Sequence, residues 1–338
     1  MRRVLTNRKV QIVLNGSFAA GLLAVMVVGG RTFAHNGFAL RHADPLLVSG
    51  ATLLFLVAYA FKAWGWQRLF PDDGDRPGAN ALAFAGGAAC VGGVALPGRL
   101  DDALRIACVK RFPGVRTGLG AVALSLVVLG LLDNAALAPL SVVAAAHASS
   151  WTVRIGFAVV AAAGVLAALL VASLPKIAER SFVMRFRVGR WLASNTHCNK
   201  RAAAALMFIS VSWALRGTAV FLLLDALSMR SSFPLALAFL CASAASAALP
   251  IAPAGAATQA GAGSAILIAS GVHAGEAIAF AVAAQVLVVG TGAIVMLLLA
   301  GWHVATRAHT PSRARTGTWY RPSVFGFVPQ RPVAATDT

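Results

Sequence analysis

Residues 95–102 read Ala-Leu-Pro-Gly-Arg-Leu-Asp-Asp, and residues 248–255 read Ala-Leu-Pro-Ile-Ala-Pro-Ala-Gly. The same tripeptide, Ala-Leu-Pro, therefore breaks two long apolar segments. Proline has no amide donor and clashes with the preceding helical turn, so the breaks at Pro97 and Pro250 free backbone polar groups. In hydrocarbon, these groups need protein or water partners. Broken apolar segments in corresponding halves of a membrane protein indicate a transport site.

The composition is that of an integral membrane protein. Of the 338 residues, 59% are hydrophobic and 12% are charged, against about 25% charged residues in soluble domains. The net charge of +18 lies in Lys and Arg clusters between apolar runs, which follows the positive-inside rule and argues against nucleic acid as a partner. The four cysteines lack metal or redox spacing. Neither a Walker loop nor a nucleophile motif is present, so we expect no cofactor, no metal and no enzymatic activity.

Six apolar runs reach the roughly 20 residues that a membrane-spanning helix needs. They cover residues 11–30, 46–66, 118–138, 151–174, 202–226 and 277–300. Two further apolar runs, at 79–97 and 235–270, contain the breaks. We therefore predict an all-α polytopic membrane protein with about six full spans and two re-entrant or broken helices.

The basic residues set the predicted orientation. With the N-terminus in the cytoplasm, most Lys and Arg residues, Lys62 among them, fall on the cytoplasmic side, as the positive-inside rule requires. The first broken segment then enters from the cytoplasm, and the second enters from outside. Two elements of opposite entry, each followed by a full span, predict an inverted repeat. The alternative is that both broken runs cross the membrane as kinked helices.

The predicted membrane domain covers residues 1–304, and both termini are expected in the cytoplasm. The tail, residues 305–338, is rich in Arg, Pro and Thr, and we predict that it is disordered. Two connecting stretches, residues 31–45 and 175–201, mix aromatic and charged residues and are expected at the membrane surface.

Charged residues directly after the first break are the first candidates for binding a lipid headgroup. They are Arg99, Asp101, Asp102 and Arg105, and they follow Pro97 and Gly98. A guanidinium such as that of Arg99 binds phosphate through two parallel hydrogen bonds, and either aspartate can pair with it or contact a cationic headgroup. The alternative is that these residues are ordinary interfacial charges paired with one another.

Arg216 lies midway along an apolar run. A charge inside the membrane costs at least about 2.5 kcal/mol and usually faces a cavity or a partner. Asp133, deep in the third predicted span, is the expected counter-ion. We predict that both residues lie at the cavity; a purely structural ion pair is the alternative.

Polar residues also follow the second break. Thr258 and Gln259 come after Pro253 and Gly255, in a stretch of small residues. Such a stretch can expose backbone amides to a phosphate near a half-helix N-terminus. The alternative is close helix packing without a ligand.

These motifs resemble those of the lysylphosphatidylglycerol synthetase transmembrane family, whose members are flippase-like membrane proteins. The segment from Leu96 to Arg105 resembles the family motif Pro-Gly-Arg-x-Gly-Glu-x-x-Arg, and residues 249–259 resemble a second signature that contains Pro-x-x-Pro-Gly-Gly. Weaker similarities lie at 66–69 and 131–133, so the resemblance covers roughly residues 10–300. The chain departs from the family in three respects: Asp101 and Asp102 stand where the family has Gly-Glu, the second signature has no acid near Gln259, and Ala254 and Ala257 replace glycines.

The resemblance implies a lipid flippase or transporter of the cell membrane, which moves a phospholipid or lipid-linked headgroup between leaflets through a cavity between the two broken helices. Membrane lipids, anionic or lipid-linked, are then the partners. The best-known members carry a further domain that transfers an aminoacyl group from tRNA to phosphatidylglycerol; we do not expect that activity here. Two alternatives stay open. One is a non-transporting scaffold for a membrane-associated glycosyl- or aminoacyl-transferase, and the other is a lipid-modifying enzyme that uses Arg99, Asp101 and Asp102.

Overall fold

The computed structural model describes residues 40, 43–70, 76–95, 100–112, 115–148, 150–178, 199–229, 231–247 and 255–308. Within these ranges all regular structure is helical, and no strand is present. The chain divides into two units, residues 1–300 and 301–338. The packing described below is that of the first unit, and the described residues of the second, 301–308, are helical.

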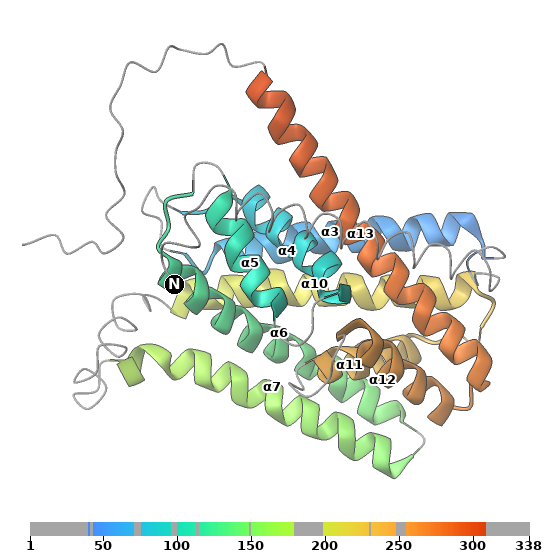
Figure 1. Cartoon of the computed structure of the whole chain (residues 1–338). Helices are drawn as coiled ribbons and strands as arrows, with labels where there is room; N and C mark the ends of the chain where they lie inside the picture. The colour runs from blue at the N-terminus through green and yellow to red at the C-terminus, as the bar shows by residue number, and fades with distance from the viewer. Residues whose placement is uncertain are drawn as a thin grey trace, which may run out of the picture. The chain divides into compact units, whose positions relative to one another are not determined.

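The helices follow one another along the chain as Figure 1 shows. They are α3 (Pro45–Gln67), α4 (Ala79–Ala95), α5 (Leu100–Arg111), α6 (Leu119–His147), α7 (Trp151–Ala178), α10 (Asn199–Ala226), α11 (Phe233–Ala247), α12 (Gly255–Ala269) and α13 (Ala274–Ala308). Five of them, α3, α6, α7, α10 and α13, are long and apolar enough to cross a membrane. They correspond to five of the six predicted spans, and the sixth, at 11–30, lies outside the described residues.

Two helices extend further than the sequence predicts. Helix α6 continues to His147 although Pro139 lies inside it. Helix α13 runs through the domain boundary predicted at 304 and ends at Ala308. Most of the two predicted surface stretches, and the tail from residue 309 onward, lie outside the described residues.

Local chemistry explains where α3 and α5 begin. The carboxylate of Asp44 accepts a hydrogen bond of 2.8 Å from the amide of Leu46, and Pro45 occupies the first helical turn; both are typical of a helix start. Helix α5 carries two aspartates in its first turn and two basic residues in its last. This arrangement complements the helix dipole.

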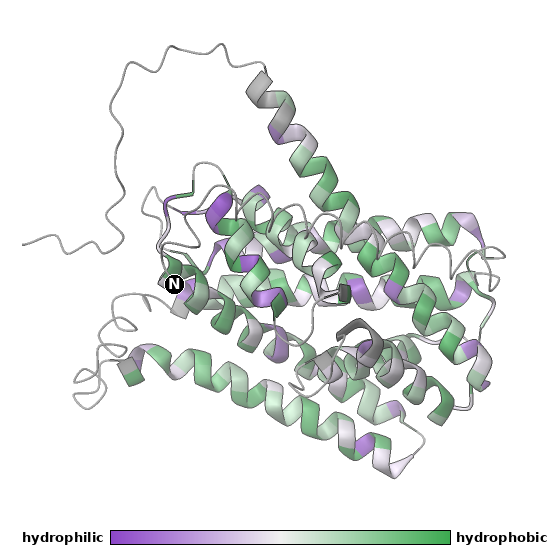
Figure 2. Cartoon of the chain, in the orientation of Figure 1, coloured by the Kyte–Doolittle hydropathy of each residue, from purple (hydrophilic) through white to green (hydrophobic). Residues whose placement is uncertain are grey.

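The outer surface of the bundle is apolar. On α7 the side chains of Trp151, Val159 and Leu166 are 71%, 62% and 65% exposed, and Figure 2 shows helices that are hydrophobic over most of their length. In a soluble protein such a continuous apolar surface would mark an interface or cause aggregation. Here it matches the hydrocarbon of the bilayer.

Helices α3 and α10 run side by side through the bundle, as do α6 and α7 (Figure 1). A Cβ at Gly65 would lie only 2.9 Å from Cγ1 of Ile209, so glycine lets α3 and α10 approach closely. The hydroxyl of Ser212 donates a 2.8 Å hydrogen bond to the carbonyl of Ala58 across the same interface. Small residues and interhelical hydrogen bonds are the usual means of helix association in membranes.

The two broken segments form two helix pairs, α4 with α5 and α11 with α12, and α12 also touches α4. Helix α4 crosses α13 closely, because a Cβ at Gly87 would lie 2.5 Å from the carbonyl oxygen of Gly292. Helix α11 packs on α13 through Phe239 and Phe280, whose ring centroids are 5.0 Å apart. Both pairs therefore contact the same helix within the bundle.

Candidate functional site

A cavity of about 170 Å³ lies where α3, α4, α5, α6, α10, α12 and α13 converge. Its polar lining comes from four of these helices at widely separated positions in the sequence. The residues are Tyr59, Lys62, Asp101, Arg105, Arg216 and Gln259. The structure thus brings four of the predicted site residues together at one place.

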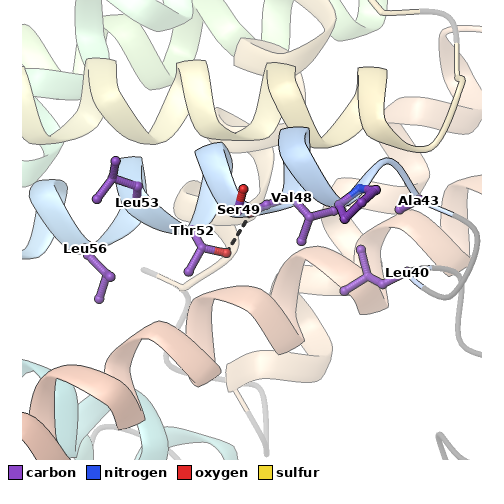
Figure 3. A pocket seen from close by; sticks show the side chains of 8 residues that line it. Leu40, Ala43, Val48, Ser49, Thr52, Leu53 and Leu56 are labelled. Atoms are coloured by element: carbon purple, nitrogen blue, oxygen red, sulfur yellow. Dashed lines mark hydrogen bonds between the residues drawn. The ribbon is translucent and has the colours of Figure 1, made fainter.

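Larger hollows exist, but they lack charged side chains. One of about 740 Å³ lies beside the first turns of α3 and is lined mainly by apolar residues (Figure 3). Its Thr52 hydroxyl donates to the carbonyl of Val48 at 2.7 Å, so this polar group is already satisfied. Another of about 540 Å³, between the ends of α6, α7, α11 and α12, has His147 and three serines as its polar lining. We assign the candidate site to the smaller cavity because charge is concentrated there.

Lys62 and Asp133 form an ion pair next to the cavity. The Nζ atom of Lys62 lies 2.8 Å from Oδ2 of Asp133, and the two side chains are 20% and 19% exposed. The indole Nε1 of Trp213 donates to the other carboxylate oxygen at 2.9 Å. Both oxygens of Asp133 therefore accept hydrogen bonds, which holds the carboxylate between α3, α6 and α10.

This pair corrects one expectation. Lys62 lies inside α3, one helical turn before Trp66, and its assignment to the cytoplasmic side stays a prediction. Asp133 was expected to neutralise Arg216, but its ionic partner is Lys62. Hydropathy indicates which apolar run holds each residue, but it does not indicate the direction of the side chain around the helix axis.

Arg216 packs against aromatic rings. Its guanidinium carbon lies 5.5 Å from the ring centre of Tyr59 and 5.1 Å from that of Trp213, distances at which cation–π attraction operates. Among the described residues no carboxylate lies within ion-pair distance, and its buried Nε has no hydrogen-bond partner. A membrane-embedded cation costs about 2.5–3.5 kcal/mol or more, which the aromatic contacts offset only in part.

The charges of α5 pair with one another. Arg105 Nη2 lies 3.5 Å from Oδ2 of Asp101, and its Nη1 lies 3.2 Å from Oδ1 of Asp102. These contacts follow from i,i+4 and i,i+3 spacing on one helix face. All three side chains are at least a quarter exposed, so each pair is worth about 1 kcal/mol or less and can open for a ligand.

Helix α12 contributes Gln259 to the cavity. Its side-chain oxygen accepts a long hydrogen bond of 3.4 Å from Nε2 of Gln285 on α13, and the hydroxyl of Ser243 on α11 donates to its backbone oxygen at 3.0 Å. Thr258, its neighbour, is half-buried and does not line the cavity. Gly255 is the first residue of α12.

Five predicted site residues lie outside the described residues. They are Pro97, Gly98, Arg99, Pro250 and Pro253. The predictions for these residues, as breaks and as a phosphate ligand, therefore stay predictions. The helices on either side do end near them, at Ala95 and Ala247.

The cavity has the chemistry of an anion-binding site. Two of its three cations, Lys62 and Arg105, are paired with aspartates, whereas the buried Nε of Arg216 has no acceptor among the described residues, and an anion in apolar surroundings is attracted to such a cation. Among the described residues, no group of three or more His, Cys, Asp or Glu side chains could hold a metal ion. The arrangement can therefore bind and orient a phosphate-bearing group.

Three residues at or beside the cavity were not predicted from the sequence: Lys62, Tyr59 and Trp213. For Lys62 the sequence contains an indication of a buried position, because this residue falls inside the apolar run 46–66 and the run continues past it. Tyr59 precedes Lys62 by three residues and Trp213 precedes Arg216 by three. That spacing puts each aromatic ring on the same helix face as the cation after it.

Residues 12–302 match the family model described as the lysylphosphatidylglycerol synthase TM region. No curated protein and no solved structure matches the chain. The match covers every described helix apart from the last residues of α13.

Proposed function

Since this chain belongs to the lysylphosphatidylglycerol synthase transmembrane family, and is therefore a multi-pass membrane protein, we propose that it moves a phospholipid or lipid-linked headgroup between the two leaflets. The headgroup would occupy the cavity that contains Arg216, and no bond of the lipid would be made or broken. The chain would then act as a transporter, not as an enzyme.

The observation that carries this proposal is the cavity itself. Inside a bundle with an apolar outer surface, four helices contribute Lys62, Arg105, Arg216 and Gln259 to the lining of one cavity. Ionisable residues at membrane depth are costly and usually mark a substrate or ion pathway. The outer surface accommodates acyl chains, while the cavity offers a headgroup the polar contacts that hydrocarbon lacks.

The order of the helices supports an inverted repeat. A long helix, a short helix pair and a second long helix occur twice, as α3, α4–α5, α6 and as α10, α11–α12, α13. Equivalent contacts recur, because α4 packs on α3 and α13, while α11 packs on α10 and α6. In this proposal α4–α5 enters from the cytoplasm, α11–α12 enters from outside, and both termini are cytoplasmic, as the positive-inside rule predicts.

A repeat of this kind provides a mechanism for exchange between leaflets. Rocking of one repeat against the other exposes a fixed central site alternately to each side. The interface between α3 and α10, which is tightly packed at Gly65, would form the axis. Weak pairs such as Arg105 with Asp101 would open and close during the motion.

The proposal can be tested with the full chain in proteoliposomes. A fluorescent phospholipid is placed in both leaflets, and an impermeant quencher reports how fast inner-leaflet lipid reaches the outer leaflet. We expect lipid exchange with the wild type and at least about tenfold slower exchange with Arg216→Ala, a loss of about 1.4 kcal/mol. Arg154→Ala is the matched control, because Arg154 is exposed on α7 and its side chain, within the described part of the chain, donates to the carbonyl of Ala148 alone.

Monodispersity after purification establishes that each variant is folded. If Arg216→Ala unfolds, Arg105→Ala serves in its place, because its surface-type pairs contribute little to stability. Equal exchange rates in protein-free and protein-containing vesicles, for every lipid offered, would reject transport. A partner transferase recovered with the inactive chain would then support the scaffold alternative.

A further inference from the structure

The last helices of the two proposed repeats, α6 and α13, can be matched residue by residue. Residues 121–130 of α6 read Ala-Val-Ala-Leu-Ser-Leu-Val-Val-Leu-Gly, and residues 281–290 of α13 read Ala-Val-Ala-Ala-Gln-Val-Leu-Val-Val-Gly. Five of these ten positions are identical, and the one polar side chain of each stretch, Ser125 or Gln285, occupies the same place. An offset of 160 residues therefore relates α6 to α13. This match bears on the inverted repeat proposed above and does not depend on transport.

The matched faces of α6 and α13 differ in what covers them. On α6, Ala138 is only 7% exposed, and a Cβ at Gly164 of α7 would lie 2.8 Å from its Cβ. The equivalents of Asn134 and Ala138 on α13 are Ile294 and Leu298, whose side chains are 40% and 66% exposed. No described helix therefore covers this face of α13 as α7 covers α6.

The apolar run at 11–30, which lies outside the described residues, resembles α7 in sequence. Residues 19–28 read Ala-Ala-Gly-Leu-Leu-Ala-Val-Met-Val-Val, and residues 162–171 of α7 read Ala-Ala-Gly-Val-Leu-Ala-Ala-Leu-Leu-Val. Six of these ten positions are identical. Gly21 is thus the equivalent of Gly164, the glycine at which α7 packs tightly on α6.

The order of the elements along the chain agrees with this match. The run at 11–30 precedes α3 as α7 precedes α10. Each repeat then has the same four parts: a first apolar segment, a long helix, a short helix pair and a last helix. In the second repeat the first segment, α7, packs on α6, which is the last helix of the other repeat. The symmetry of an inverted repeat predicts the same contact between the run at 11–30 and α13.

The described start of α3 shows where the run at 11–30 is tethered. Leu40 lines the groove beside the first turns of α3 (Figure 3). Residue 30 lies ten residues upstream, so it is at most about 35 Å from Leu40 even in a fully extended chain. Further along α3, the hydroxyl of Tyr59 would lie 3.1 Å from a Cβ at Gly292 of α13. The run is therefore tethered to a helix that itself meets α13.

We propose that the run at 11–30 forms a membrane helix that covers the exposed face of α13, with Gly21 against Leu298 as Gly164 lies against Ala138. Each repeat then places its first helix on the last helix of the other repeat, which holds the two repeats together.

The same match assigns the two sides of this helix. On α7, Ala167 is 7% exposed and Leu166 is 65% exposed. Their equivalents are Ala24 and Leu23. Ala24 therefore faces the bundle, and Leu23 faces the lipid.

Disulfide formation tests the contact, in membranes that contain the full chain without its native cysteines. On mild oxidation, Gly21→Cys combined with Leu298→Cys should form an intramolecular disulfide, because this bond needs Cβ atoms about 3.5–4.5 Å apart. Ala24→Cys with Ile294→Cys is the second pair, in case a side chain at position 21 disturbs folding. Leu23→Cys with Leu298→Cys is the matched control, and its yield should be at least about fivefold lower.

A disulfide from either pair, together with a low yield from the control, supports the proposal. No disulfide from either pair, or a control yield equal to theirs, overturns it and leaves lipid as the cover of this face. Disulfide-linked dimers of Leu298→Cys alone assign the face to a second copy of the chain and also overturn it.

Exchange of lipid between leaflets is measured in parallel on the wild type. The disulfide without lipid exchange supports the contact and rejects transport, whereas lipid exchange without the disulfide rejects the contact alone.

Discussion

The ion pair between Lys62 and Asp133 should stabilise the bundle only while both partners are present. Removing one partner of a buried pair leaves an uncompensated charge and costs about 3–5 kcal/mol, whereas removing both is often neutral. The Nζ–Oδ2 distance is 2.8 Å, and about a fifth of each side chain is exposed. Partial solvation places the expected cost of Asp133→Asn at the lower end of that range, at about 3 kcal/mol.

A double-mutant cycle measures this directly. The free energy of unfolding is determined in mixed detergent micelles for the wild type, Asp133→Asn, Lys62→Met and the double variant. Each single variant should be destabilised, and the double variant should be more stable than Asp133→Asn, because no buried charge is left unpaired. Coupled residues give interaction energies of roughly 0.5–3 kcal/mol, and we expect a value in the upper half of this range. Additive losses, or an Asp133→Asn variant as stable as the wild type, would refute the reasoning.

Three other predictions follow from the described contacts. Gly292→Val should lower the free energy of unfolding by about 1–3 kcal/mol, because a Cβ at this position would lie 3.0 Å from the nearest atom of α4. Gly290→Val is the control and should be near neutral, because a Cβ at Gly290 would meet nothing within 4 Å. Thermal unfolding of the two variants measures the difference. Trp213→Phe should lower the free energy of unfolding by about 1.5–3 kcal/mol, because it removes the indole donor to the carboxylate of Asp133 while an aromatic ring stays beside the guanidinium of Arg216. Equal unfolding free energies of the variant and the wild type would contradict this. In a chain without its native cysteines, an impermeant maleimide added to intact cells should label Ser232→Cys and not Gly78→Cys, and the reverse pattern would contradict the proposed orientation.

The long helices could be predicted because the length of an apolar run reports directly on the thickness of the hydrocarbon. Runs 46–66, 151–174 and 202–226 each became one helix with ends shifted by a few residues. The end of α6 was harder to predict. Pro139 would break a helix in water, but in a membrane bundle neighbouring groups can satisfy the freed carbonyl, and the helix continues to His147.

The candidate site was predictable in part. Arg216 and Asp133 stand out in sequence because charge is rare inside an apolar run. The partner of each residue depends on which helices are neighbours and how each is rotated, and neither property can be read from hydropathy. Lys62 shows the result: its position near the end of a run suggested the interface, whereas the neighbouring α6 supplies it with a buried carboxylate.

The central claim is that a lipid headgroup enters the cavity at Arg216. A phosphatidylglycerol analogue with a photoreactive group on its headgroup tests this claim most directly. The analogue is incorporated in vesicles with the full chain and illuminated, and mass spectrometry of the cross-linked peptides then identifies the residues that carry adducts. The account predicts adducts on the cavity-lining stretches of α3, α10 and α12, around Tyr59, Arg216 and Gln259, and their loss with an excess of unlabelled phosphatidylglycerol. Adducts confined to the lipid-facing surface of α7 or to helix ends would contradict it.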